Sequence, residues 1–581
     1  MRTVFRRVGK GNFFLLLLCM VFTVLEVHYD LKIPDVMSDM TMYVQEGNNN
    51  MAEIYRAGGK MFIYTAISLI NVIISSVILA KFTSDFSAKL RKDLFYKSQD
   101  LSQNEINRFS VSSLITRATN DLVNIESAIV LGLLVIFKAP LMAGMAINKI
   151  RSQDRQWSLL TAAVVIFIII MSLIALFLIY KKFISIQLLT DNVNNVAREN
   201  MKGVYTIRAF NFERKRSERF FEKNFELTKT EQYTDSIVAV ANVTITVVLN
   251  ITTVLIYLLG ASTINNAEGE KKLILFSDML VYSTYAMQII NSLVMMMVIF
   301  IFLPKAIVSV KRIAEVLETE SSIIDGSESI EGGIETIEFR NVFMAYPGAK
   351  ENVLTDINFS VNKGETLAVT GPTGSGKTTL IKALMRLYDT SNGQILINGQ
   401  DIKEYSLKEM YSNIGYVPQN NILFKGTAAS NIAYGLQEID DDMLNKACST
   451  SDVNSFLEDS AKVSESSVLG EGSNYSGGQK QRLSIARALY KEPSVLIMDD
   501  SFSALDFKTD KNIRTKLKKE YKDAIKIIIS QRISTIIDAD NILVLDDGKI
   551  VGSGKHEDLM RKCVQYREFA DVQLNGGTSD E

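Results

Sequence analysis

The sequence has few cysteines and histidines, and its charges are balanced. Cys19, Cys448 and Cys563 are far apart and form no CxxC pair, which argues against a disulfide framework and against a zinc site. His28 and His556 are too few and too scattered for a metal cluster. The 63 basic and 65 acidic residues give a net charge of −2, so the basic surplus of a nucleic-acid-binding protein is missing.

Long uncharged runs fill the first half of the chain. With 581 residues the chain is too long for a single core, so at least two domains are expected. A membrane-spanning helix needs about 20 mostly apolar residues. Six runs meet this need, at residues 13–34, 61–80, 127–147, 157–180, 236–260 and 279–304. They predict an α-helical transmembrane domain over residues 1–320.

The basic residues around these runs predict their orientation. Four of them precede the first run: Arg2, Arg6, Arg7 and Lys10. Lysine and arginine also gather between the second and third runs and between the fourth and fifth. These positions predict a multi-pass protein of the cell membrane with a cytoplasmic N-terminus. Both connections contain few turn residues, so we expect helices that extend out of the membrane into the cytoplasm.

The first run is expected to stay in the mature chain. No small-residue cleavage site follows it, and five more runs come later, so it does not read as a cleavable signal. Only about a dozen residues precede it, which disfavours a built-in protease domain.

Some of the predicted spans contain polar groups. Lys138 has three open interpretations: a pair with a carboxylate, a bond to an anionic ligand, or a side chain that reaches the membrane surface. Asn242, Thr246, Asn250 and Thr253 share one face of the fifth span. This stripe either bonds neighbouring helices or lines a path through the membrane, and both interpretations stay open.

The second half changes to short apolar strands that alternate with amphipathic helices. This pattern predicts an α/β domain over residues 334–581, joined through a linker at residues 321–333. Residues 371–378, GPTGSGKT, fit the phosphate-loop motif G-x-x-x-x-G-K-[ST] between a strand and a helix. The residues expected to contact a bound nucleotide here are Gly371, Thr373, Gly374, Ser375, Gly376, Lys377, Thr378 and Thr379. Lys377 is expected on the β and γ phosphates and the Thr378 hydroxyl on Mg2+.

Two carboxylates follow a second buried strand. Residues 495–498 are apolar, and Asp499 and Asp500 come directly after them. A carboxylate at the carboxyl end of such a strand lies near the phosphate loop and can hold Mg2+. We assign that role to Asp499, and the polarisation of the attacking water to Asp500.

Residues 476–482, SGGQKQR, resemble the signature motif of ATP-binding-cassette (ABC) proteins. Other family elements follow in order. Tyr346 is similar to the aromatic residue that stacks on adenine, and Gln419 to the Q-loop residue that contacts Mg2+ and water. Asp506 resembles the D-loop aspartate, and Gln531 occupies the switch-histidine position. Residues 114–121 and 203–213 resemble the intracellular segments of ABC exporters, so the resemblance covers nearly the whole chain.

This resemblance implies a half-transporter of the type IV, multidrug- or lipid-exporter kind. Such a chain dimerises with a second half-transporter, and ATP lies between the phosphate loop of one chain and the signature of the other. The signature residues that would act on the partner's ATP are Ser476, Gly477, Gly478 and Gln479. The exported substrate is not identified; a drug, a lipid or a peptide each fits a mixed apolar and polar path.

Tyr475 replaces the usual leucine before the signature, and the two catalytic positions also depart from the family pattern. Asp500 stands where active members carry glutamate, and Gln531 stands where they carry histidine. Aspartate is one methylene shorter, and a misplacement of about 1 Å can cost on the order of 10²-fold in rate. Glutamine donates a hydrogen bond but cannot become cationic. The chain therefore resembles the degenerate-site subunit of a bacterial heterodimeric ABC exporter, with an impaired site of its own and a different partner chain.

Two alternatives remain open. One is a homodimeric exporter that hydrolyses ATP slowly at two equal sites. The other is an ATP-gated channel or a regulatory subunit, in which ATP binding is sufficient.

Overall fold

The computed structural model describes residues 10–45, 51–151, 155–268, 271–297, 299–436, 438–457 and 460–575. The chain divides into two compact units. The first contains Met1–Gln99 and Val111–Thr319, and the second contains Asp100–Ser110 and Glu320–Glu581. Arg2, Arg6 and Arg7, which carry part of the orientation prediction, lie outside the described residues.

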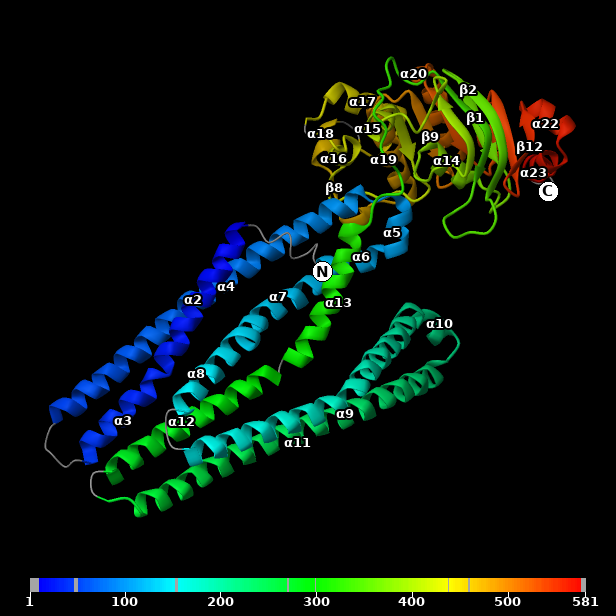
Figure 1. The fold of residues 1–581 in the computed structure, drawn as a ribbon. Coiled ribbons are helices and arrows are strands. Elements are labelled where there is room, and N and C mark those ends of the chain that lie inside the picture. Colours follow the sequence, from blue (N-terminus) through cyan, green and yellow to red (C-terminus); the bar gives the residue numbers. More distant parts are fainter. Residues whose placement is uncertain are drawn as a thin grey trace. The chain divides into compact units, whose positions relative to one another are not determined.

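The first unit is entirely helical in its described part (Figure 1). Its α-helices are α2 (Lys10–Asp30), α3 (Lys32–Gln45), α4 (Met51–Asp100), α6 (Val111–Ala118), α7 (Asn120–Gly132), α8 (Ala139–Arg151), α9 (Arg155–Lys202), α10 (Val204–Ala209), α11 (Glu213–Asn265), α12 (Lys271–Met297) and α13 (Ile299–Glu318). A π-helix, η1 (Leu133–Lys138), joins α7 to α8. A six-residue π-helix is rare, and such segments often mark functional positions.

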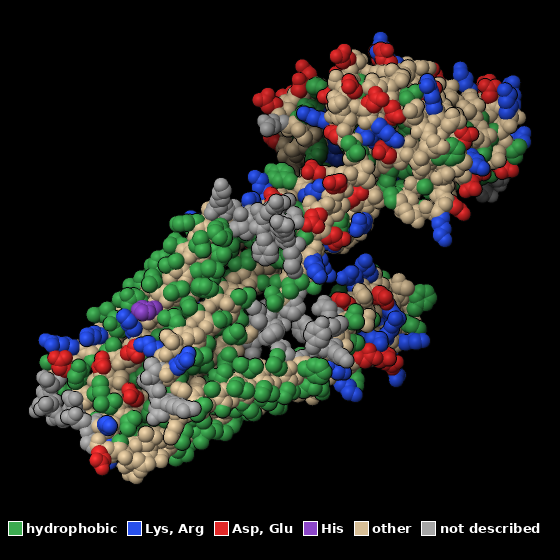
Figure 2. Space-filling model, in the orientation of Figure 1, with side chains coloured by type: hydrophobic (Ala, Val, Ile, Leu, Met, Phe, Trp, Pro, Cys, Tyr) green, Lys and Arg blue, Asp and Glu red, His purple; other side chains and the backbone are tan. Residues whose placement is uncertain are grey.

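Among the described residues, six helical stretches are long and apolar enough to cross a membrane, which confirms the prediction of a six-helix transmembrane domain. Three of the helices are much longer than a span, because α4 has 50 residues, α9 has 48 and α11 has 53. At about 1.5 Å per residue, 50 residues extend about 75 Å, against a hydrocarbon core of about 30 Å. The predicted continuation of helices beyond the membrane is therefore confirmed. Figure 2 shows apolar side chains along the spans and charged ones gathered around α10.

The polar groups of the spans have two different environments. Lys138, at the end of η1, forms an ion pair with the buried carboxylate of Glu26 on α2. The first of its three interpretations, a pair with a carboxylate, is therefore confirmed. On α11, in contrast, Asn242, Thr246 and Asn250 are exposed, and the Thr246 hydroxyl bonds the backbone of its own helix at 3.0 Å. The fourth residue of the stripe, Thr253, is half-buried and bonds the backbone of its own helix at 3.0 Å.

The second unit is an α/β domain, as the alternating pattern predicted, and it is built on two main sheets. The larger sheet has the order β12-β11-β3-β10-β9-β6, and only the β11–β12 pair is antiparallel. Its strands are β3 (Thr366–Thr370), β6 (Ile414–Val417), β9 (Val495–Asp499), β10 (Ile525–Ile529), β11 (Asn541–Asp546) and β12 (Lys549–Gly554). The strands β3, β9 and β10 are apolar on both faces because core side chains cover each face of the sheet.

A smaller antiparallel sheet has the order β2-β1-β4-β5. Its strands are β1 (Thr336–Met344), β2 (Leu354–Asn362), β4 (Asn392–Ile397) and β5 (Gln400–Asp401). A two-stranded ribbon pairs β7 (Gly426–Thr427) with β8 (Ser467–Val468).

The helices of this unit complete the α/β fold. They are α14 (Lys377–Leu384), α15 (Leu407–Asn413), α16 (Ala428–Ile432), α17 (Asp441–Thr450), α18 (Ser460–Glu465), α19 (Gly477–Tyr490), α20 (Phe507–Glu520), α21 (Ile533–Ile536), α22 (His556–Lys562) and α23 (Val564–Asn575), with short 3-10 turns η2 (Val453–Ser455) and η3 (Gly470–Gly472). One further helix, α5 (Gln103–Phe109), comes from between two membrane helices but belongs to this unit. Its Glu105 carboxylate accepts a 3.4 Å bond from the Ser322 N–H.

Candidate functional site

The phosphate loop lies between β3 and α14, as its motif requires. Gly371 has a φ of 146°, and a Cβ there would lie 2.0 Å from the carbonyl oxygen of Leu545. Gly376 has a φ of 99° and precedes the first residue of α14. Glycine is required at Gly371 for space and at both positions for the left-handed backbone. The loop therefore presents its N–H groups at a helix N-terminus, which favours bound phosphate.

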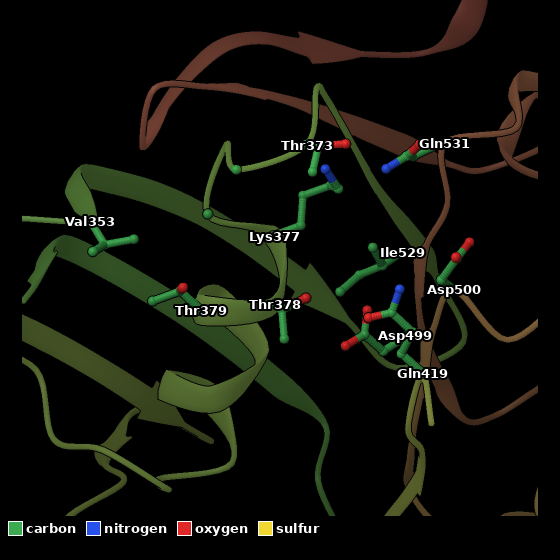
Figure 3. A pocket seen from close by; sticks show the side chains of 12 residues that line it. Val353, Thr373, Lys377, Thr378, Thr379, Gln419, Asp499, Asp500, Ile529 and Gln531 are labelled. Carbon is green, nitrogen blue, oxygen red and sulfur yellow. The ribbon is translucent and has the colours of Figure 1, made fainter. Parts of the chain in front are cut away.

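A cavity of about 230 Å³ opens beside this loop (Figure 3). Its lining residues come from the loop and the start of α14, from the ends of β9 and β10 and the segments that follow them, and from positions next to β2 and β6. They are Val353, Thr373, Gly374, Gly376, Lys377, Thr378, Thr379, Gln419, Asp499, Asp500, Ile529 and Gln531. The parallel strands bring these residues together because the carboxyl ends of β3, β9 and β10 meet at one edge of the sheet.

Lys377 supplies a positive charge to the cavity. Its Nζ donates to the carbonyl oxygens of Gly371 at 2.8 Å and Pro372 at 2.7 Å. Burial lowers the pKa of Lys377, and the nearby carboxylates of Asp499 and Asp500 oppose this shift. The amine is thus a buried donor whose present acceptors are backbone carbonyls, and phosphate oxygens are stronger acceptors for it.

Asp499 is the last residue of β9 and is buried. Burial raises its pKa, and the neighbouring charge of Asp500 adds to the rise. A hydrogen bond from Thr378 and the charge of Lys377 act in the opposite direction. A carboxylate and a hydroxyl are oxygen ligands of the kind that Mg2+ prefers, and here they are in direct contact. The donor set therefore fits this ion.

Asp500 and Gln531 occupy the side of the cavity opposite α14, and Figure 3 shows the Gln531 side chain turned toward the phosphate loop. Asp500 has a left-handed backbone, with a φ of 50°. Its N–H donates to the Ile529 carbonyl at 3.0 Å, and its own carbonyl accepts a 2.9 Å bond from the Ser503 hydroxyl. The backbone under the Asp500 carboxylate is therefore fixed to both neighbouring segments.

Tyr346 lies beside the cavity rather than in its lining. Its hydroxyl is 3.0 Å from the hydroxyl of Thr379, which does line the cavity. Lys382 places its ammonium 5.6 Å from the centre of the Tyr346 ring. The ring is half-buried, so the structure places the predicted adenine-stacking residue within reach of the loop and in contact with its helix.

The signature residues and Asp506 are not part of this cavity. Ser476 caps α19, because its hydroxyl accepts from the Gln479 N–H at 3.4 Å and Gln479 Oε1 accepts from the Ser476 N–H at 2.9 Å. Ser476 and Gly477 are exposed, and Gly478 is half-buried. Asp506 caps α20 by accepting a 3.0 Å bond from the Thr509 N–H, which lowers the pKa of this exposed carboxyl group. Both helix starts face solvent in the single chain.

Three contributors to the site were not predicted from the sequence. Val353 and Ile529 line the cavity with apolar groups but belong to no motif. Gln481, buried in α19, donates to the Asp500 carbonyl at 3.3 Å and accepts from the Ala504 N–H at 3.3 Å. It lies inside the SGGQKQR segment, so the motif was a signal for it, but its contacts depend on the packing of α19 against residues 500–504.

Comparison with family models assigns both halves of the chain. The model described as "ABC transporter transmembrane region" matches residues 16–293. The model described as "ABC transporter" matches residues 354–503, which include the phosphate loop, the signature, Asp499 and Asp500.

Individual proteins agree with these matches. An uncharacterized ABC transporter ATP-binding protein of Mycobacterium tuberculosis is 31% identical over 535 residues, covering 91% of this chain and 90% of the relative. The uncharacterized ABC transporter ATP-binding protein YfiB of Bacillus subtilis is 31% identical over 537 residues, with 90% of each chain covered. The solved structure of a bacterial Atm1-family ABC exporter with ATP bound has the same fold, with a TM-score of 0.81, 21% identity, and 97% and 99% of the two chains covered.

Proposed function

The chain belongs to the ABC transporter family, with its transmembrane region and ATP-binding domain in one polypeptide, and from this premise we propose that it is one half of a dimeric exporter. It is a multi-pass membrane protein with a cytoplasmic nucleotide-binding domain, and the family couples ATP hydrolysis to transport. In our proposal its own site binds ATP and hydrolyses it slowly, while its signature completes the active site of a different partner chain.

The pair Asp500 and Gln531 carries this proposal. Both residues line the nucleotide cavity. The resemblance to the family gives Asp500 the place of the general base and Gln531 the place of the γ-phosphate contact. The shorter aspartate withdraws its carboxylate by about one bond length from the water that it must hold, and catalysis is sensitive to a shift of about 1 Å. Gln531 retains a donor for the γ-phosphate but cannot carry the positive charge of a protonated histidine. Binding is thus preserved while hydrolysis is weakened.

Mg2+ fits the residues of this cavity. Asp499 and Thr378 would hold it directly or through water, and the side-chain oxygen of Gln419 is available on the same cavity wall. Bound Mg2+ supplies positive charge to the phosphate oxygens. The role of the protein groups is to orient the phosphates: Lys377 holds them from the loop, and the N–H groups at the start of α14 bind their oxygens.

The exposed signature supports a partner chain. The cap formed by Ser476 and Gln479 fixes the start of the 14-residue helix α19, whose first residue, Gly477, is exposed. A helix start of this kind attracts phosphate, and in this chain it lies outside its own nucleotide cavity. It therefore suits a nucleotide that a second half-transporter holds.

Export, rather than import, is supported by the architecture. The membrane helices precede the nucleotide-binding domain in the same chain, and three of them extend far beyond a span. The shared fold with the bacterial exporter adds support from the arrangement of the elements alone. The cargo stays open between amphipathic drugs, lipids and peptides, and analogy with the family favours a drug or a lipid-like molecule.

The native mass of the complex, purified gently from its source membrane, tests the proposal. Two unequal chains are expected, identified by mass spectrometry of the separated subunits. A complex of twice 65.0 kDa would instead support the homodimer with two slow, equal sites.

A second experiment addresses the degenerate site. The double replacement Asp500→Glu and Gln531→His should raise ATP turnover by adding a second competent site, and each single replacement should raise it less. An unchanged turnover in the double variant would contradict an impaired site. ATP-dependent substrate flux into inverted vesicles separates transport from ATP-gated conduction.

A further inference from the structure

The side-chain amide of Gln573, on α23, bonds the backbone on both sides of Arg532. Its Nε2 donates to the carbonyl oxygen of Gln531 at 2.8 Å, and its Oε1 accepts from the N–H of Ile533 at 2.8 Å. One bond needs a donor and the other an acceptor, which an amide side chain supplies together and a carboxylate or an ammonium group does not. The end of the chain thus holds the loop that carries Gln531.

This contact also completes the start of α21. The first N–H groups of a helix have no partner within the helix, and a side chain normally satisfies one of them. Arg532, at the N-cap position, makes no such bond with its own side chain. Gln573, 40 positions further along the chain, provides the missing acceptor. In the four-residue helix α21, this cap adds a hydrogen bond to the burial of Ile533 and Ile536 in the core.

Helix α23, which carries Gln573, is held in place by the hydrophobic core. Tyr566 and Ala570 are fully buried in the larger hydrophobic core. The Tyr566 hydroxyl also lies 2.8 Å from Nδ1 of His556 on α22. Gln573 follows Ala570 by three positions, so it projects from the same side of the helix as the buried residues.

The opposite side of the loop is held by Arg532. Its guanidinium donates to the carbonyl oxygens of Ser503 at 2.6 Å and Leu505 at 3.2 Å, in the segment that contains Asp506. The backbone from the Gln531 carbonyl to Ile533 is therefore anchored from two directions, while the Gln531 side chain lies in the nucleotide cavity (Figure 3).

We propose that Gln573 is a positioning residue that sets the Gln531 side chain for the γ-phosphate of ATP. The inference rests on the proposed role of Gln531 as the γ-phosphate contact. It makes the C-terminal helix part of the nucleotide site, although Gln573 itself touches neither nucleotide nor metal. Since ADP has no γ-phosphate, the loss of this positioning must weaken ATP binding selectively.

Photolabelling of the complete transporter tests this selectivity. The probes are 8-azido-ATP and 8-azido-ADP with Mg2+, at low temperature, and this chain is resolved from its partner by electrophoresis. Gln573→Ala removes both bonds, and Gln573→Glu keeps the acceptor for Ile533 while it loses the donor to Gln531. Val572→Ala, on an exposed neighbour in the same helix turn, is the matched control. Gln531→Ala reports the γ-phosphate contact itself.

We expect Gln573→Ala and Gln573→Glu to lower the affinity for the ATP probe about three- to tenfold, as the loss of the hydrogen bond from Gln531 to the γ-phosphate predicts. The affinity for the ADP probe should stay within about twofold of the parent. Gln531→Ala should give the same selective loss, and Val572→Ala none. A selective loss in Gln531→Ala without one in either Gln573 variant would overturn the positioning role alone. Equal losses of affinity for the ATP and ADP probes would show that Gln573 has a structural role only, and would also overturn the positioning role. No selective loss in Gln531→Ala would overturn the role of Gln531 and this inference with it.

Discussion

The side-chain amide of Asn107 donates a 2.9 Å hydrogen bond to the hydroxyl of Tyr388, and this bond joins α5 to the nucleotide-binding domain. The ring of Tyr388 meets that of Tyr346 edge-on, with centroids 5.1 Å apart. Tyr346 in turn bonds Thr379 in the nucleotide cavity. Three consecutive contacts thus lead from a segment between two membrane helices to the ATP site.

Breaking the first of these contacts should slow ATP hydrolysis by the assembled transporter. We expect Asn107→Ala and Tyr388→Phe each to lower the ATPase rate of the assembled transporter about two- to tenfold, because a neutral hydrogen bond contributes about 0.5–1.5 kcal/mol. The double variant should be no worse than either single one. Asn104→Ala is the control on the same helix, since Asn104 bonds Glu105 and not Tyr388. Additive losses in the double variant would show that the two residues act separately.

Asp499→Asn should stabilise the nucleotide-free protein at neutral pH. Because the pKa of Asp499 is raised in the folded state, the fold binds a proton more tightly than the unfolded chain does. Stability therefore falls as pH rises from the unfolded pKa through the folded one, and it stays at the lower level above that window. The neutral amide removes this loss, so thermal unfolding at pH 7 should occur at a higher temperature.

The same substitution should abolish the further stabilisation that ATP with Mg2+ gives, because it removes a charged ligand of the ion. Melting curves with and without ATP and Mg2+, recorded from pH 5 to 8, check both effects. A lower melting temperature for nucleotide-free Asp499→Asn would contradict the unfavourable burial of this charge.

Gly371 and Gly374 should differ in their tolerance of a side chain. Gly371→Ala places a methyl group 2.0 Å from the Leu545 carbonyl oxygen on a backbone with a φ of 146°, so we expect a loss of more than about 3 kcal/mol of stability. Gly374 also has a positive φ, of 88°, but no atom lies within 4 Å of its Cβ position. Gly374→Ala should therefore cost only about 1–2 kcal/mol. Equal losses in denaturant unfolding would rule out the steric contribution.

The ion pair of Lys138 and Glu26 should be more sensitive to the loss of one partner than to the loss of both. Lys138→Ala leaves the buried Glu26 carboxylate without its cation, at a cost of about 3–5 kcal/mol, whereas the double change Glu26→Gln with Lys138→Met removes both charges and should cost less. Lys149→Ala, at the more exposed pair with Asp35, is the control, with an effect of about 1 kcal/mol or less. Thermal stability in detergent measures all three.

The elements that depend on local sequence were predictable. The six apolar runs correspond to six candidate spans among the described residues, because the length and the apolar composition of a helix decide whether it can cross a membrane. The helix bounds were harder to predict from the sequence. The first predicted run, 13–34, corresponds to α2 and α3, which continue to Gln45. Polar residues such as Asp35 are helical there, and their bonds to Tyr285 and Lys149 come from other helices.

The residues in and around the nucleotide cavity also fall into two groups, those that the sequence could predict and those that it could not. Lys377, Thr378 and Asp499 were predictable because a motif fixes the strand, loop and helix that carry them. Gln481 and Gln573 were not, because their contacts arise when helices distant in sequence pack against the cavity. No periodicity or spacing in α23 distinguishes Gln573 from the other polar residues of that helix.

The exposed amides on α11 have a consequence for the biogenesis of the protein. Asn242 and Asn250 lie in the fifth span and are exposed in the single chain. Each amide costs several kcal/mol when it faces hydrocarbon without a hydrogen-bonding partner. A newly inserted subunit that has not yet assembled therefore carries two amide groups whose exposure to hydrocarbon is unfavourable. Assembly with a partner chain should therefore make this span more stable, so the unassembled subunit should be the less stable form of the chain in the membrane.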